Sequence, residues 1–299
     1  MQTKRQIQQL LASAGVRPNK RLGQHFLIDL NLMRLLVDSA NINSNDIVLE
    51  AGCGTGSLTG ELVEKAGFVL AVELDKTLAG LAKSSLVDAD NVEIINTDIL
   101  KNKNTLSHTV VCALETARKK YNGRVLLVAN LPYNIASPTM MNLITGPATA
   151  DAIYVTVQKE VADRMTALPG SSDYGILSIF LSAVGDVKTM RVLRPSVFWP
   201  QPRIDSAMVG FVRKQEKYRR IEDMDLFGEI VNLFMGHRRK TLTACSRLAC
   251  GRLEKINNIK GMNWPEIFER CGIVPTKRPE QLCSEDYIAI ANLCRSSLV

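Results

Sequence analysis

The stretch that decides the fold is DIVLEAGCGTGSLTGELVEKAGFVLAVELD, residues 46–75. It begins with a short apolar run, turns at a glycine-rich segment, continues with apolar residues at helical spacing over 57–65, and ends in a second apolar run, 68–73. Short apolar runs joined by a helical pattern are typical of a strand–helix–strand unit in a parallel sheet. The stretch therefore predicts an α/β fold.

The same alternation continues along the chain. Further strands are expected at 92–95, 125–129 and 152–157. Helices are expected at 6–14, 30–40, from 76 onward, and at 106–120, 137–143 and 160–167. Two later apolar runs, 187–193 and 207–212, flank a proline-rich loop and are expected to form a closing hairpin at the sheet edge. Beyond Lys214 only helical patterns remain, which predicts an α/β domain over 1–214 and a small α-helical domain over 215–299.

The positive charge is concentrated at the two ends of the chain. The 299 residues carry a net charge of +7 at a pI of about 9.0. Residues 1–24 hold five Lys and Arg and no acid, residues 25–212 have a net charge of −3, and residues 213–299 one of +5. This distribution fits a polyanionic partner held by the two ends, although a charged surface that only maintains solubility is an equally simple explanation.

Cysteine and apolar content point to a reduced protein without a metal. None of the seven Cys form a C-x-x-C pair and there are only three His, so neither a zinc site nor a disulfide framework is expected. The longest apolar stretch, 176–184, is too short for a membrane span. We expect a cytoplasmic protein, with an organelle transit segment as the alternative to an ordinary first helix at the basic N-terminus.

Polar residues stand at the ends of four successive predicted strands. Gly52 and Gly54 follow the first strand, Glu73 ends the second, Asp98 follows the third and Asn130 follows the fourth. Because ligands bind beyond the carboxyl ends of the strands in an open parallel sheet, these groups are expected to line one crevice. Taken singly, each has a simpler explanation: a tight turn, a helix-capping acid, a loop acid and a polar turn.

The glycine segment favours a nucleoside ligand without phosphates. Neither possible frame fits the dinucleotide pattern G-x-G-x-x-G, and no Lys of the Walker type follows. Glu73 lies 21 residues after Gly52, where a carboxylate can accept both hydroxyls of a ribose. Asp98 can accept from an adenine amino group. A positively charged nucleoside suits this acidic crevice, and S-adenosylmethionine is such a molecule.

The turn Asn130-Leu131-Pro132-Tyr133 suits chemistry on an adenine amino group. That amine is a poor nucleophile because its lone pair is delocalised into the ring. The side-chain carbonyl of Asn130 and the backbone carbonyl of Leu131 can hold its two hydrogens, while Pro132 stiffens the turn. Tyr133 offers a flat face on which an extruded base can stack. No general base is required, because the nitrogen loses its proton after it has attacked.

These residues together resemble the ribosomal RNA adenine N6,N6-dimethyltransferases of the KsgA/RsmA type, over nearly the whole chain. The matching stretches are KRLGQHFL (20–27), EAGCGTGSLT (50–59), AVELD (71–75), NTD (96–98), NLPYNIASP (130–138), PSVFWPQPRIDSAMV (195–209), FMGHRRKTL (234–242) and GIVPTKRPEQL (272–282). NLPYNIASP is the most specific of them. Cys53 stands where the family often has Pro, and Cys283 where it often has Ser.

The resemblance implies a Rossmann-like S-adenosylmethionine-dependent methyltransferase domain followed by a helical domain that contacts RNA. By the same resemblance, His25 and Leu27 lie in the segment that closes over the cofactor, and Phe198 packs on the target adenine opposite Tyr133. Arg238, Arg239 and Lys240 would contact RNA. The simpler alternatives are a loop residue for His25, hairpin core for Phe198 and a solvated helix end for the three cations.

The expected function is dimethylation of two adjacent adenosines in a small-subunit (16S) ribosomal RNA hairpin, during assembly of that subunit. The implied partner is the small ribosomal subunit, with no membrane and a monomeric enzyme. Two alternatives remain. One is a large-subunit RNA methylase of the macrolide-resistance type, which shares the Asn130–Tyr133 turn. The other is an RNA-binding assembly factor that has lost its activity, against which Glu73, Asp98, Asn130 and Tyr133 argue.

Overall fold

The computed structural model describes residues 1–19, 22–248 and 263–296 and divides the chain into two compact units. The first comprises Met1–Ala162 and Val187–Val212, and the second comprises Asp163–Asp186 and Arg213–Val299. Lys20 and Arg21, which belong to the predicted N-terminal motif, lie outside the described residues.

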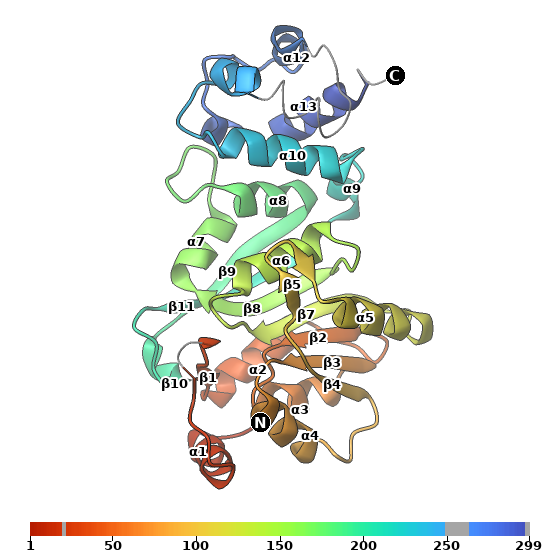
Figure 1. Cartoon of the computed structure of the whole chain (residues 1–299), viewed down its shortest axis with the longest axis vertical. Helices are drawn as coiled ribbons and strands as arrows, with labels where there is room; N and C mark the ends of the chain where they lie inside the picture. Colours follow the sequence, from red (N-terminus) through yellow and green to blue (C-terminus); the bar gives the residue numbers. More distant parts are fainter. Residues whose placement is uncertain (20–21, 249–262, 297–299) are drawn as a thin grey trace. The chain divides into compact units, whose positions relative to one another are not determined.

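A seven-stranded sheet forms the centre of the first unit (Figure 1). The strand order is β4 (Val92–Asn96), β3 (Phe68–Glu73), β2 (Ile47–Ala51), β7 (Val125–Asn130), β8 (Ala152–Gln158), β11 (Ser206–Arg213) and β9 (Gly185–Leu193). The first five strands are parallel, and β11 runs antiparallel to β8. The predicted strands are confirmed to within three residues, including the two that close the sheet edge.

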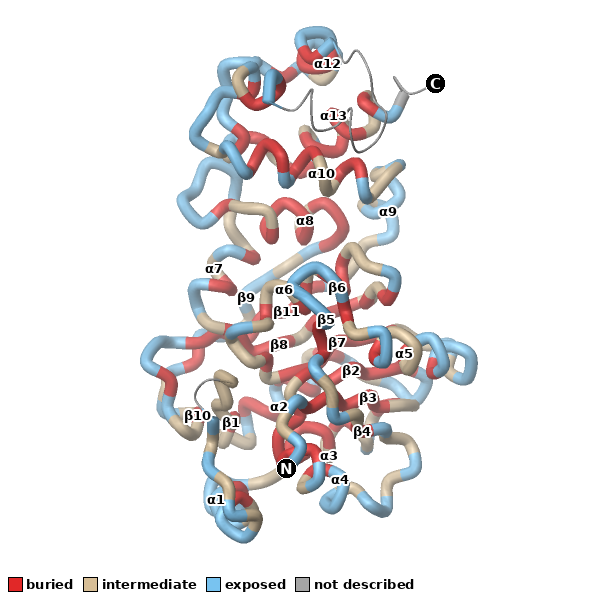
Figure 2. Tube along the Cα trace, in the orientation of Figure 1, coloured by how far each residue is buried: buried red, intermediate tan, exposed pale blue. Residues whose placement is uncertain are grey.

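Helices cover both faces of this sheet because its central strands are apolar on both sides (Figure 2). One face of the sheet carries α2 (Leu30–Ser39), α3 (Ser57–Val63) and α4 (Lys76–Ser85). The other face carries α5 (His108–Lys120) and α6 (Ala136–Thr145). The start of α4 is fixed by Asp75, whose side chain accepts from the backbone N–H groups of Thr77 and Leu78. The helices predicted between the strands of this sheet are present, which confirms the α/β fold class.

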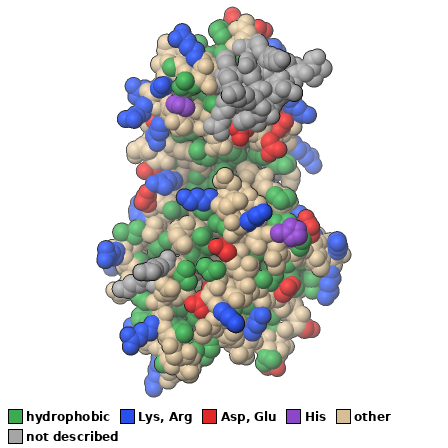
Figure 3. Space-filling view, in the orientation of Figure 1, with side chains coloured by type: hydrophobic (Ala, Val, Ile, Leu, Met, Phe, Trp, Pro, Cys, Tyr) green, Lys and Arg blue, Asp and Glu red, His purple; other side chains and the backbone are tan. Residues whose placement is uncertain are grey.

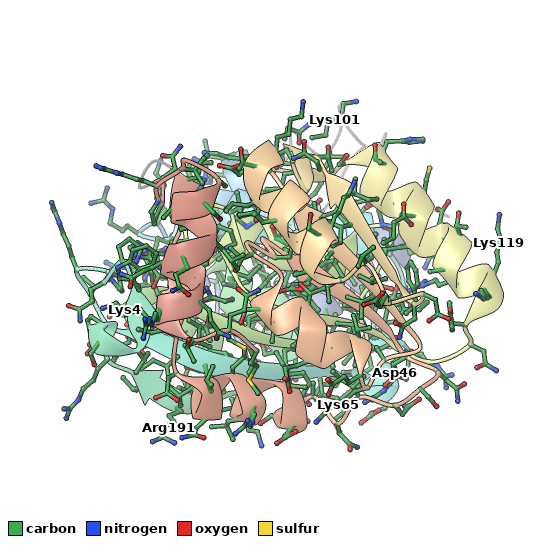
Figure 4. All side chains as sticks on the ribbon, turned by 90° about the horizontal axis from the view of Figure 1, so that it is seen from below. Lys4, Asp46, Lys65, Lys101, Lys119 and Arg191 are labelled. Atoms are coloured by element: carbon green, nitrogen blue, oxygen red, sulfur yellow. The ribbon has the colours of Figure 1, made fainter. Side chains whose placement is uncertain are left out.

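Short elements that the sequence does not reveal surround the carboxyl ends of the strands. Two-residue β1 (Phe26–Leu27) pairs with β10 (Phe198–Trp199), and β5 (Leu100–Asn102) forms a small hairpin with β6 (Thr105–Leu106). Helix α1 (Lys4–Ser13) packs its Ile7 and Leu11 against Leu78 of α4. Figure 4 shows Lys4, at the start of α1, on the opposite side of the unit from Asp46, which precedes β2. Helix α1 therefore lies toward the carboxyl ends of the strands.

The described part of the second unit is helical, as predicted for the residues beyond Lys214. Its helices are the second half of α7 (Lys159–Thr166), then α8 (Ile176–Val184), α9 (Gln215–Tyr218), α10 (Met224–Met235), α12 (Trp264–Arg270) and α13 (Ser284–Ser296). Phe180 of α8 packs edge-on against Phe227 of α10 at 5.1 Å between ring centres. This apolar contact places 163–186 with the C-terminal unit, whereas the division into domains 1–214 and 215–299 stays a prediction.

Candidate active site

Residues from all four strand ends line a single cavity in the first unit. The predicted site residues that line it are His25, Leu27, Gly52, Gly54, Glu73, Asp98, Asn130, Leu131, Pro132 and Tyr133. Parallel strands bring their carboxyl ends to one edge, and the residues that follow them meet there. The structure therefore brings together every predicted catalytic and cofactor-binding residue except Phe198.

The glycine loop packs directly against the Asn130–Tyr133 turn. Gly52 has a φ of +79°, and a Cβ at this position would lie 2.8 Å from Cγ of Pro132. Gly54 has a φ of +58°, and a Cβ there would lie 2.9 Å from the ring of Phe26. Only glycine combines this backbone conformation with such a close approach. The two motifs, nearly eighty residues apart in sequence, thus share one wall of the cavity.

Glu73 holds the glycine loop and the start of the next helix. Its Oε2 accepts from the backbone N–H of Gly54 at 2.8 Å, and its Oε1 accepts from the N–H of Asp75 at 2.8 Å. The side chain is 6% exposed, and this burial raises the pKa of its carboxyl group, although the two hydrogen bonds oppose the rise. Each carboxylate oxygen keeps a lone pair that can accept from a hydroxyl group of a ligand in the cavity.

Glu50 is a second buried acid that lines the cavity, and it is not among the site residues predicted from the sequence. It is the last residue but one of β2 and is 2% exposed, and its Oε2 has no hydrogen-bond partner among the described residues. Burial, together with the nearby charge of Glu73, raises the pKa of Glu50 to about 8. The signal in the sequence that could have assigned Glu50 to the site is its position, directly before the glycine loop. A cationic ligand group would be favoured beside it.

The pKa of Glu50 predicts a pH-dependent stability for the ligand-free protein. Because the native pKa of about 8 lies above the ordinary value of 4.5, the neutral carboxyl supports folding fully below about pH 4.5. That support is lost as the pH rises to about 8. Relative to Glu50→Gln, the wild-type free energy of unfolding should fall by on the order of 5 kcal/mol across this range. Urea unfolding of both proteins at several pH values measures it; a pH-independent difference would contradict the assignment.

The amide of Asn130 has a fixed orientation. Its Nδ2 donates to the backbone carbonyl of His25 at 2.7 Å, and its Oδ1 accepts from the hydroxyl of Thr156 at 2.5 Å. The backbone N–H of Leu131 donates to the carbonyl of Thr156, while no donor from the described residues reaches the Leu131 carbonyl. Each of the two predicted acceptors thus keeps a lone pair for a substrate amine.

Tyr133 is held by its ring face and its hydroxyl. Its ring stacks on that of His25 at 5.3 Å between centres, and its hydroxyl lies 2.7 Å from Oγ of Ser206. Burial raises the pKa of this hydroxyl, while the Ser206 hydrogen bond lowers it. Nδ1 of His25 donates to the carbonyl of Pro200 at 2.6 Å, because a carbonyl oxygen can only accept. One face of Tyr133 is therefore covered by His25.

Asp98 and Phe198 differ in how they relate to the cavity. Asp98 is exposed at its wall, and its Oδ1 accepts from the N–H of Leu100, which leaves its other oxygen available. Phe198 is only 1% exposed and packs with Leu27 in the hydrophobic cluster beneath α2, so it does not line the cavity. The reason is the pairing of β10 with β1, which turns the ring into the core. Contact of Phe198 with a base would require a rearrangement of this segment.

The three predicted RNA-binding cations lie just beyond α10 in the second unit. Arg238 donates through Nε to Oε2 of Glu280 at 2.8 Å and through its other end to the carbonyl of Ser172. Arg239 and Lys240 are exposed. Figure 3 shows Lys and Arg side chains distributed over the visible face and interspersed with acidic ones. Arg238 thus has an internal partner, whereas Arg239 and Lys240 project to solvent.

Neither a metal centre nor a membrane helix is found in the described part of the chain. Residues 1–19, 22–248 and 263–296 contain no group of three or more His, Cys, Asp and Glu side chains placed to hold a metal ion. Within the same ranges, every helix is too short or too polar to cross a bilayer.

Comparison with known proteins identifies the family. The family described as "Ribosomal RNA adenine dimethylase" matches residues 15–267. The chain belongs to this family. Proteins named ribosomal RNA small subunit methyltransferase A are similar to it: that of Alkaliphilus oremlandii is 38% identical, covering 92% of this chain and 91% of the relative. That of Clostridioides difficile is 36% identical, covering 94% and 92%. The chain is thus a methyltransferase of the ribosomal RNA adenine dimethylase family.

Solved structures show the same fold. A dimethyladenosine transferase from Plasmodium falciparum superposes with a TM-score of 0.72 at 24% identity, covering 91% of this chain and 98% of the other. The 23S rRNA methyltransferase ErmE superposes with a TM-score of 0.62 at 20% identity, covering 89% and 98%. Both likenesses support the Rossmann-like methyltransferase fold of this ribosomal RNA adenine dimethylase.

Proposed function

We propose that this enzyme dimethylates N6 of two adjacent adenosines in a small-subunit (16S) ribosomal RNA hairpin, with S-adenosylmethionine as methyl donor. The observation that carries the proposal is the pair of acceptors in one turn, Oδ1 of Asn130 and the carbonyl of Leu131, beside an acidic cavity. The relatives at 36–38% identity bear small-subunit names. That naming favours the small subunit over the large-subunit alternative.

The cavity residues fit S-adenosylmethionine by their chemistry. The oxygens of Glu73 suit the two ribose hydroxyls, the free oxygen of Asp98 suits the adenine amino group, and buried Glu50 suits a positive charge. Gly52 and Gly54 form the part of the cavity wall that packs closely on Pro132 and Phe26, and His25 and Leu27 line the same cavity. When bound, S-adenosylmethionine supplies an electrophilic methyl group.

The chain itself contributes alignment and electrostatic stabilisation. Asn130 and Leu131 accept the two amine hydrogens and favour tetrahedral geometry at the target nitrogen, which places its lone pair outside the ring plane. Pro132, packed on Gly52, keeps the two acceptors in position. A base stacked on Tyr133 uses the face that His25 leaves open. The cationic nitrogen loses its proton to water after methyl transfer, so none of these residues needs to act as a base.

Transfer of labelled methyl groups tests the proposal. Purified enzyme and labelled S-adenosylmethionine are incubated with small subunits that lack the modification, and separately with free large-subunit RNA. We expect dimethyladenosine at two adjacent positions in the small-subunit RNA and no labelling of the large-subunit RNA. Labelling of only the large-subunit RNA would favour the macrolide-resistance type. A folded protein that binds the cofactor but labels neither RNA would favour a non-enzymatic assembly factor.

We further propose that Arg239 and Lys240 contact RNA phosphates. Arg238, which is held by Glu280, would keep this segment in position. Arg239→Ala/Lys240→Ala should weaken binding to the small subunit about tenfold at physiological salt and reduce the salt slope of log K by about two. Filter binding at several salt concentrations measures both. Lys119→Ala/Lys120→Ala, which also removes two exposed cations, is the matched control and should change neither. An equal loss in both variants would reduce the proposal to a general charge effect.

The proposed working form is a cytoplasmic monomer. The described Cys residues are all free thiols, as expected for a reducing compartment. All the proposed catalytic residues come from one chain, so a second copy is not needed to complete the cavity. Light scattering should give a mass near the 33.0 kDa of the chain. A dimer mass would contradict the monomer.

A further inference from the structure

We propose that Thr156 is a positioning residue that fixes the catalytic amide of Asn130 through its hydroxyl group. This inference rests on the proposed function, because it assigns to Asn130 the task of holding the target amine. Thr156 lies on β8, directly opposite Asn130 of β7 in the sheet register. No motif of the sequence marks it, and its position in an apolar strand suggests only a core residue.

The hydroxyl of Thr156 lies completely inside the protein. The residue is 0% exposed, and its Oγ1 donates to Oδ1 of Asn130 at 2.5 Å. A buried hydroxyl without a partner is destabilising, and valine has nearly the same shape without that cost. The hydroxyl is thus explained by its hydrogen bond rather than by packing.

The hydrogen bond determines which end of the Asn130 amide faces which neighbour. The NH2 end donates to the His25 carbonyl, which cannot donate in return, and the oxygen end accepts from Thr156. With both ends held, the second lone pair of Oδ1 has a fixed direction. The backbone carbonyl of Thr156 also accepts from the N–H of Leu131, the second residue of the turn. One residue of β8 therefore supports both proposed amine acceptors.

The test compares two substitutions that separate the hydroxyl from the methyl group. Thr156→Val keeps the volume and removes the hydroxyl, and should lower kcat about tenfold with the cofactor KM within about twofold of wild type. Thr156→Ser keeps the hydroxyl, and its kcat should stay within about threefold of wild type. Adding Thr156→Val to Asn130→Ala should cause no further loss, because the amide it positions is gone.

Thr139→Val is the matched control. Thr139 is also buried, on α6, but its hydroxyl has no hydrogen-bond partner among the described residues. The same atoms change, and kcat should stay at the wild-type value. Unchanged kcat in Thr156→Val would overturn the proposal. So would an equal loss in Thr156→Ser and Thr156→Val with unchanged melting temperatures, because the methyl group would then be the important part.

A spectroscopic measurement separates this inference from the proposed function. The side-chain amide signals of Asn130 in a nitrogen-15 spectrum are assigned by their disappearance in Asn130→Ala. They should shift in Thr156→Val and stay near the wild-type positions in Thr156→Ser and Thr139→Val. If wild-type enzyme labels no small-subunit RNA, the proposed function fails while these shifts still decide the Thr156 contact. Unshifted Asn130 signals in Thr156→Val would overturn the contact itself.

Discussion

Asn130→Ala is expected to reduce methyl transfer about 1,000-fold and to leave the affinity for S-adenosylmethionine within about threefold of wild type. The substitution removes Oδ1, one of the two proposed acceptors of the amine hydrogens, and with it the partner of the Thr156 hydroxyl. The loss falls on turnover because these hydrogen bonds strengthen as the nitrogen becomes tetrahedral and positively charged.

Single-turnover transfer to small subunits and calorimetric binding of the cofactor measure the two quantities separately. The cofactor should still bind because the oxygens of Glu73 belong to a different strand end. Asn104→Ala, in the exposed turn between β5 and β6, removes an amide outside the cavity and serves as the control. Turnover of Asn130→Ala at the level of this control would show that the amide has no part in catalysis.

The sequence predicts the part of the site that depends on local order. Gly52, Glu73, Asp98 and Asn130 each end or follow a strand whose apolar run can be read directly, and the carboxyl ends of parallel strands meet at only one edge. That logic needs no knowledge of which strand pairs with which. The cavity could therefore be predicted from four strand ends, and the structure places all four on its wall.

The residues that support the site depend on long-range register, which periodicity does not give. Thr156 meets Asn130 only because β8 lies beside β7 in one register, and a shift of one residue would turn its hydroxyl to the other face. Ser206 reaches Tyr133 through the antiparallel pairing of β11 with β8. Phe198 is the converse case: a two-residue strand directs its ring into the core, and no pattern of that length predicts a direction.

Glu73→Ala is expected to weaken binding of S-adenosylmethionine about 100-fold, equivalent to about 3 kcal/mol. The proposed ribose contacts are two hydrogen bonds to a charged acceptor, each worth about 1.5 kcal/mol or more. The substitution also removes the acceptor for the Gly54 N–H, which holds the glycine loop against the ligand. Once the cofactor is saturating, turnover should stay within about fivefold of wild type, since the amine acceptors are untouched.

Calorimetry of cofactor binding and turnover at rising cofactor concentrations measure these effects. Glu93→Ala is the matched control, because Glu93 is an exposed acid on the neighbouring strand β4 and lies outside the cavity lining. Its affinity should equal that of wild type. The two active-site variants then separate binding from chemistry. Excess cofactor should restore the turnover of Glu73→Ala, whereas it should not restore the turnover of Asn130→Ala. If excess cofactor fails to restore Glu73→Ala while its affinity is unchanged, Glu73 acts on the chemical step and the assignment to the ribose is wrong.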